Sequence, residues 1–159
     1  MKTYAGIGSR NTPSQILRTM EQFARDAAGW TLRSGAAYGA DSAFERGAEL
    51  TEIWLPWRGY NSHVSQSIVT PAAIAMAAKF HPAWDRCSQG VRKLHGRNMH
   101  IILGDDLQTP VNFVVCWTVD GAITGGTGVA LRCAIQHNIP IFNLALPGHL
   151  DAARGFTHN

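Results

Sequence analysis

A chain of 159 residues is long enough to bury one hydrophobic core, so a disulfide framework or a structural metal is not required for folding. Hydrophobic residues make up 45% and charged residues 16% of the sequence, which excludes a disordered chain and is typical of a globular one. The formal net charge of +3 permits binding of a phosphorylated ligand. No apolar run is long enough for a membrane helix, so we expect a cytoplasmic protein with no membrane partner.

The first third of the chain alternates strand and helix signals. Strands are predicted over three short apolar runs, at residues 2–7, 30–34 and 52–56. Helices are predicted between them, over residues 14–29 and 40–50. Each of the first two strands runs into a turn that is rich in glycine. This order is typical of strand–turn–helix units in a parallel sheet.

The pattern changes between residues 57 and 107, where no strand is predicted. Two helices are expected there, over residues 72–80 and 88–103, the second interrupted by Gly90 and Gly96. The alternation then resumes with a strand, a helix and a strand, over residues 112–117, 129–137 and 139–144. We therefore predict a single α/β domain with a Rossmann-like, doubly wound, mainly parallel sheet and a helical insertion at about 57–107. In such a sheet the ligand lies at the carboxyl ends of the strands.

Two glycine-rich turns, far apart in the sequence, lie at this predicted edge. Each follows an apolar run and precedes a helix, so its backbone N–H groups and the helix N-terminus can converge on a phosphate. The Arg10 guanidinium and the Ser9 and Thr127 hydroxyls add side-chain donors. The ligand-binding candidates from these turns are Gly6, Gly8, Ser9, Arg10, Gly125, Gly126, Thr127 and Gly128.

A third turn, after the strand at 30–34, carries an acidic pair. Asp41 and Glu45 lie one helical turn apart, so both carboxylates can point toward the strand edge. One of them is expected to hold a ribose hydroxyl or to transfer a proton, and both are candidate catalytic residues. A helix cap and a surface ion pair are the alternative interpretation. The ligand-contact candidates in this segment are Ser34, Gly35, Gly39 and Asp41.

Further candidates follow the third strand, end the strand at 112–117, or lie in the insertion. Aromatic rings at the sheet edge can stack on a nucleobase, and an arginine between them can meet a phosphate. Core packing is the competing interpretation for the aromatic residues, and an asparagine in the insertion is expected to act as a lid residue. These candidates are Trp57, Arg58, Tyr60, Asn98, Trp117 and Thr118.

The cysteines and histidines do not indicate a metal site. The three cysteines are irregularly spaced, and the seven histidines form no HExxH motif or other tight ligand spacing. We therefore predict no metal and no cofactor.

Three motifs in chain order carry a resemblance to a known family. Gly-Ile-Gly-Ser-Arg, then Ser-Gly-Ala-Ala-Tyr-Gly-Ala-Asp, then Gly-Gly-Thr-Gly before a helix resemble the SLOG superfamily, which joins the DNA-processing protein A fold to the LOG phosphoribohydrolases. The resemblance covers residues 3–56 and 111–145. It implies a Rossmann-like fold that binds nucleotides, nucleotide-derived signals or single-stranded DNA, and some members cleave N-glycosidic bonds. Members commonly pair through helices, so a homodimer is an open expectation.

One position departs from the enzyme branch of that family. LOG-type hydrolases carry PGGxGTxxE, and aligning residues 125–128 on this motif puts Arg132 in the place of its glutamate. An arginine cannot activate water, but it can hold a phosphate. We therefore expect capture of a phosphorylated nucleotide, such as an NAD- or ADP-ribose-like compound or a nucleoside monophosphate, for sensing or sequestration. N-glycosidic hydrolysis with Glu45 or Asp41 as the acidic group is the alternative.

Single-stranded DNA is a further alternative partner. Basic residues gather in the insertion near Trp84, whose ring can stack on a base, although a solvated helix face would give the same pattern. This basic group consists of Arg86, Arg92, Lys93, His95, Arg97 and His100.

Overall fold

The computed structural model describes residues 1–158, which form an α/β fold around one all-parallel sheet. The strand order is β4-β3-β2-β1-β5-β6. The strands are β1 (Thr3–Gly6), β2 (Thr31–Ser34), β3 (Leu50–Leu55), β4 (Ser67–Ile68), β5 (Phe113–Cys116) and β6 (Ile141–Asn143). The α-helices are α1 (Ser14–Asp26), α2 (Ala40–Gly47), α3 (Pro71–Ala77), α4 (Gln89–Leu103), α5 (Gly125–Gln136) and α6 (His149–His158). Short 3-10 turns are η1 (Tyr60–Ser62), η2 (Ala78–Phe80), η3 (Trp84–Arg86) and η4 (Val119–Gly121).

The strands β1 and β5 form the centre of the sheet, and every residue of both is buried. Strands that are covered on both faces are nearly continuous apolar runs, which is why both were recognisable in the sequence. Their register places Tyr4 opposite Phe113, and the two rings stack with centroids 5.5 Å apart. The predicted Rossmann-like, doubly wound parallel sheet is confirmed.

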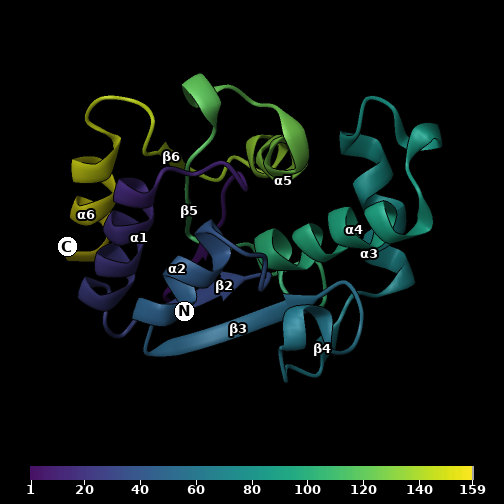
Figure 1. Ribbon diagram of the computed structural model, residues 1–159, viewed down its shortest axis with the longest axis horizontal. Coiled ribbons are helices and arrows are strands. Elements are labelled where there is room, and N and C mark those ends of the chain that lie inside the picture. Colours follow the sequence, from purple (N-terminus) through teal and green to yellow (C-terminus); the bar gives the residue numbers. More distant parts are fainter. Residues whose placement is uncertain (159) are drawn as a thin grey trace.

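Helices cover both faces of the sheet (Figure 1). One core lies between the sheet and α1, α2 and α6, and includes Phe23, Phe44 and Phe113. The other lies between the sheet and α3, α4 and α5, and includes Met99 and Leu131. In α1 the buried positions recur at helical spacing, so one stripe of the helix faces the sheet. None of the helices within residues 1–158 has the length and apolar character needed to cross a membrane.

The chain leaves β1 and β5 in opposite directions across the sheet. From β1 it passes through α1 to β2 on one side, and from β5 it passes through α5 to β6 on the other. The two loops stay joined at first, because Ile7 N–H donates to the Val115 carbonyl at 3.1 Å and Ser9 N–H to the Trp117 carbonyl at 3.1 Å. Beyond Ser9 they diverge, and such a switch point is where open α/β sheets bind ligands.

Four elements differ from the sequence-based expectations. The segment 57–107 contains a short strand, β4, which pairs with β3 through Trp54 and Leu55. The helix α4 is continuous, and Gly96 within it lies where α3 packs closely, since a Cβ there would lie 2.7 Å from Ile74 Cγ1. The helix α5 begins at Gly125, before the expected residue 129, and α6 was not expected. A two-residue strand and a glycine-rich first helical turn carry no periodic signal that a sequence pattern could reveal.

Candidate functional site

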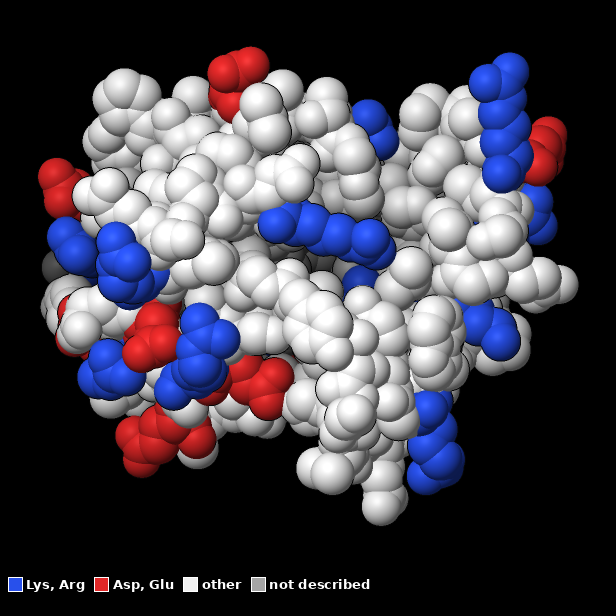
Figure 2. Space-filling view, viewed as in Figure 1, with Lys and Arg blue, Asp and Glu red and all other residues white. Residues whose placement is uncertain are grey.

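A cavity of about 540 Å³ lies at the switch point, a volume typical of small-molecule sites. It is enclosed by the loops after β1 and β5, the turn after β2, η1, α4 and the N-terminus of α5. Figure 2 shows the molecule hollowed at the middle of this face, with basic side chains beside the hollow. The two predicted glycine-rich turns, more than a hundred residues apart, therefore both reach one cavity.

The predicted ligand-binding and catalytic residues separate into two groups. Those that line the cavity are Gly8, Ser9, Arg10, Asp41, Tyr60, Asn98, Thr118, Gly125, Gly126 and Thr127. Those that do not line it are Gly6, Ser34, Gly35, Gly39, Glu45, Trp57, Arg58, Trp117, Gly128 and Arg132. The cavity-lining residues that were not predicted as ligand contacts are Ile7, Asn11, Ala37, Val91, Leu94, His95, Arg97, Val119 and Thr124.

The N-terminus of α5 presents unpaired backbone donors to the cavity. The Gly128 N–H donates to the Thr124 carbonyl at 3.0 Å, whereas the N–H groups of Gly125, Gly126 and Thr127 have no acceptor within residues 1–158. Thr124 precedes the helix without capping it through its side chain. Gly125 adopts φ of 68°, a left-handed conformation that favours glycine. Free amides and the positive end of the helix dipole make this turn suitable for an anion.

The first glycine turn is built differently, and the expectation that its amides hold an anion is wrong for Ile7 and Ser9, whose N–H groups are bonded within the protein. Besides Ser9 N–H, which bonds the Trp117 carbonyl, Asn11 N–H donates to Ser9 Oγ at 3.1 Å and Thr12 N–H to the Ser9 carbonyl at 3.2 Å. Its glycines serve close packing: a Cβ on Gly8 would lie 2.7 Å from Ala40 Cβ. The N–H groups of Gly8 and Arg10 have no acceptor within residues 1–158, so the turn offers the cavity these two amides, the Arg10 side chain and the Ser9 hydroxyl proton.

A buried arginine that was not among the predicted ligand contacts completes the cationic side of the cavity. Arg97 is only 5% exposed and donates from Nη1 to the Gly35 carbonyl and from Nε to Asn98 Oδ1 at 3.0 Å. Its guanidinium also lies 5.6 Å from the centre of the Tyr60 ring. In the described part of the chain it forms no ion pair with a carboxylate. A buried cation without a carboxylate partner is costly, so this guanidinium is suited to an anionic ligand.

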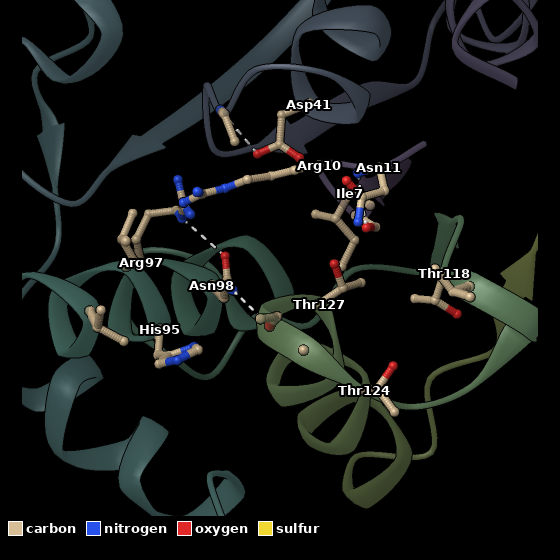
Figure 3. A pocket seen from close by; sticks show the side chains of 18 of the residues that line it. Ile7, Arg10, Asn11, Asp41, His95, Arg97, Asn98, Thr118, Thr124 and Thr127 are labelled. Carbon is tan, nitrogen blue, oxygen red and sulfur yellow. Dashed lines mark hydrogen bonds between the residues drawn. The ribbon is translucent and has the colours of Figure 1, made fainter. Parts of the chain in front are cut away.

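The two arginines and the α5 terminus are held in one arrangement. Figure 3 shows Arg10 reaching across the cavity toward Arg97. The Asn98 side chain joins Arg97 to the helix turn, because its Nδ2 lies 3.5 Å from the Gly126 carbonyl (Figure 3). Gly35 leaves room for the buried guanidinium, since a Cβ there would lie 2.6 Å from Arg97 Nη1. Gly35 thus supports the site without lining the cavity.

The two residues of the predicted acidic pair, Asp41 and Glu45, lie in different environments. Asp41 lines the cavity, is 5% exposed and accepts a hydrogen bond from Ala37 N–H at 3.3 Å. Burial raises the pKa of Asp41 to about 6, and the Arg97 charge only partly opposes this effect. Glu45 instead lies 2.7 Å from His63 Nε2, outside the cavity. Only Asp41 is therefore placed to act on a ligand in this cavity.

Arg132 does not take the phosphate-binding position expected for it. Its Nη1 donates to the Phe80 carbonyl at 3.0 Å and its Nη2 to the Ile123 carbonyl at 3.3 Å. These bonds tie α5 to η2 and to the loop before α5 and use the guanidinium for structure. Ser34 is likewise structural, because its buried hydroxyl donates to the Gly6 carbonyl at 2.6 Å.

The basic group in segment 57–107 does not form one exposed face. His95, Arg97 and His100 are buried, and Arg92 packs over the Trp84 ring at 5.2 Å. A different signal in the same helix could have identified the cavity wall. The α4 residues that line the cavity on one helix face recur at intervals of one, three or four residues, and they are Val91, Leu94, His95 and Asn98.

Comparisons with known proteins identify no relative of this chain. No protein-family model, curated protein or solved structure matches this chain. The chemistry of the cavity is therefore the basis for assigning a function.

Proposed function

We propose that the protein binds a phosphorylated nucleotide or nucleotide derivative in the switch-point cavity. One observation carries this proposal: two guanidinium groups without carboxylate partners within residues 1–158, one of them buried, converge near the free N-terminus of α5. Guanidinium forks and free backbone amides are the donors that proteins direct at phosphate. The charge of a phosphate group would offset the cost of burying Arg97.

The rest of the cavity suits a nucleoside attached to that phosphate. Asp41 can accept hydrogen bonds from ribose hydroxyls on the side of the cavity nearest the turn after β2. Tyr60, Val91 and Leu94 provide an aromatic ring and apolar side chains against which a base can pack. An NAD- or ADP-ribose-like compound and a nucleoside monophosphate are the ligand classes that this chemistry favours, and the binding serves sensing or sequestration.

Thermal unfolding with a ligand panel tests the proposal. The panel pairs each nucleoside monophosphate with its nucleoside, and adds NAD, ADP-ribose, inorganic phosphate and a single-stranded oligonucleotide. We expect stabilisation by the phosphorylated compounds, little or none by the matched nucleosides, and a weak effect of phosphate alone. Stabilisation by the oligonucleotide alone, with a steep salt dependence, would contradict nucleotide binding and support binding of single-stranded DNA instead.

A hydrolytic function is the second candidate, and Asp41 is the observation that favours it. A cavity carboxyl with a pKa of about 6 is partly protonated near neutral pH, as a general acid or base requires. The test is release of free base from nucleoside monophosphates and NAD. Hydrolysis by this site predicts release that Asp41→Asn abolishes and Glu45→Gln retains, whereas binding with no release supports capture alone.

A further inference from the structure

A second cluster of reactive side chains lies beside the cavity. His81, Cys87 and His95 each offer one ligand atom, and these atoms all lie within 4.8 Å of one another. The three residues come from different elements: His81 follows η2, Cys87 follows η3, and His95 lies in α4. Their sequence intervals match no short metal-binding motif, so only the fold brings them together.

The His95 ring contributes a buried polar atom that has no hydrogen-bond partner within residues 1–158. The residue is 7% exposed, and its Nδ1 is buried with no hydrogen-bond partner among residues 1–158. Buried polar atoms in folded proteins are nearly always paired, so an unpaired one requires an explanation.

We propose that His81 Nε2, Cys87 Sγ and His95 Nδ1 bind one transition-metal ion of the zinc class. Two imidazoles and a thiolate form a ligand set that suits Zn²⁺ and its substitute Co²⁺. Bond lengths of about 2.1 Å to nitrogen and about 2.3 Å to sulfur place two tetrahedral ligands about 3.6 Å apart. The distance from Cys87 Sγ to His81 Nε2 is 3.5 Å, so this pair already has the required separation.

Metal binding at this cluster would remove the Cys87 thiol proton, move the His81 ring proton and break one hydrogen bond. The Cys87 thiol would release its proton to solvent and bind as thiolate. His81 Nδ1 now accepts a hydrogen bond from Ala83 N–H at 2.9 Å, so Nε2 carries the ring proton. Coordination through Nε2 would move that proton to Nδ1, and the Ala83 N–H would then lose Nδ1 as its acceptor. The alternative is a metal-free cluster, in which Cys87 Sγ donates to the Ala83 carbonyl at 3.7 Å.

The position of His95 would place the metal at the wall of the cavity. His95 lines the cavity as well as belonging to the cluster, and Figure 3 shows it near the start of α5. Three protein ligands leave one tetrahedral position for a water or for an oxygen of a bound molecule, as in catalytic zinc sites. The metal proposal does not depend on the proposed nucleotide function, because its ligands are side chains of the protein alone.

Titration of the full, reduced chain with Co²⁺ tests the site without any nucleotide. We expect one Co²⁺ per chain, with the visible bands of tetrahedral coordination and a thiolate-to-cobalt charge-transfer band that Zn²⁺ removes by displacement. Cys87→Ser should abolish the charge-transfer band, and His95→Gln should weaken Co²⁺ binding at least tenfold. His137→Gln is the matched control, since His137 lies near Cys133 in a Cys–His pair that lacks a third ligand in the described chain, and it should bind as the wild type does.

Two results would overturn the proposal. One is a wild-type chain that shows no tetrahedral Co²⁺ spectrum, and the other is a spectrum that Cys87→Ser and His95→Gln leave intact. Thermal melting of each variant checks that it is folded, and His81→Asn offers a further ligand substitution if His95→Gln unfolds. A negative titration leaves the nucleotide proposal standing, because the two tests share no reagent.

Discussion

Arg10→Ala should weaken binding of the proposed ligand without changing the stability of the fold. Arg10 is exposed, and over residues 1–158 its side chain makes no hydrogen bond or ion pair. Surface substitutions of this kind change the free energy of unfolding by no more than about 0.5 kcal/mol. The variant should therefore melt at nearly the wild-type temperature without ligand and differ only in the ligand's effect.

The expected loss of affinity follows from the charge of the missing contact. A hydrogen bond to a charged group contributes about 1.5 to 3 kcal/mol, so Arg10→Ala should raise Kd by about 10- to 150-fold. A ligand at about 100 times the wild-type Kd stabilises the fold by about 2.7 kcal/mol, which for a domain of this size raises Tm by about 5 to 11 °C. After a 50-fold loss, the same ligand concentration gives only about 0.6 kcal/mol and a shift of about 1 to 3 °C.

The assay is thermal unfolding of wild type and variants with the best nucleotide of the panel. Arg18→Ala is the matched control, because Arg18 is an exposed arginine on α1 that does not line the cavity. It should keep the full wild-type shift. An Arg10→Ala protein that retains the full shift would refute the assignment of Arg10 to the phosphate, whatever the identity of the ligand.

Three further outcomes test the supporting geometry. Gly35→Ala should displace the Arg97 guanidinium, whose Nη1 would lie 2.6 Å from the new Cβ, and calorimetry should show weaker nucleotide binding. Gly125→Ala should cost about 1 to 2 kcal/mol of stability in a urea titration, because φ of 68° disfavours a side chain. Burial raises the pKa of Asp41 from 3.8 to about 6, so the folded protein binds this proton more tightly than the unfolded chain does. The free energy of unfolding should therefore fall by about 3 kcal/mol as the pH rises from 3.8 to about 6. Urea titrations across this pH range should show that Asp41→Asn removes the part of the stability loss that Asp41 causes. A variant with the same pH dependence of stability as the wild type would contradict the raised pKa of Asp41.

The local pattern of the sequence was enough to predict the fold class. The central strands are short apolar runs buried on both faces, and glycine turns separate strands from helices, so β1, β2, β5 and α1 could be recognised one at a time. The rule that parallel strands bind ligands at their carboxyl ends then predicted which turns would meet. Arg10, Asp41 and the start of α5 were found in this way, because their turns follow strands directly.

The residues that the sequence misplaced are those whose roles depend on distant partners. Arg97 looked like part of a basic surface, yet its guanidinium is buried against the carbonyl of Gly35, 62 positions earlier. Arg132 was expected at a phosphate, but the Phe80 carbonyl, 52 positions away, accepts one of its hydrogen bonds. Ser9 N–H is likewise bonded to a carbonyl on a neighbouring loop.

The sequence by itself determined the α/β alternation and the sheet edge at which the candidate cavity lies, because strand and helix periodicity and glycine turns are properties of short segments. The tertiary structure alone decided which donors remain free at that edge. It also decided that His81, Cys87 and His95 meet. The physical reason is that each polar group bonds whatever partner the packed helices and strands bring within reach, and that partner is set by contacts between segments far apart in the chain.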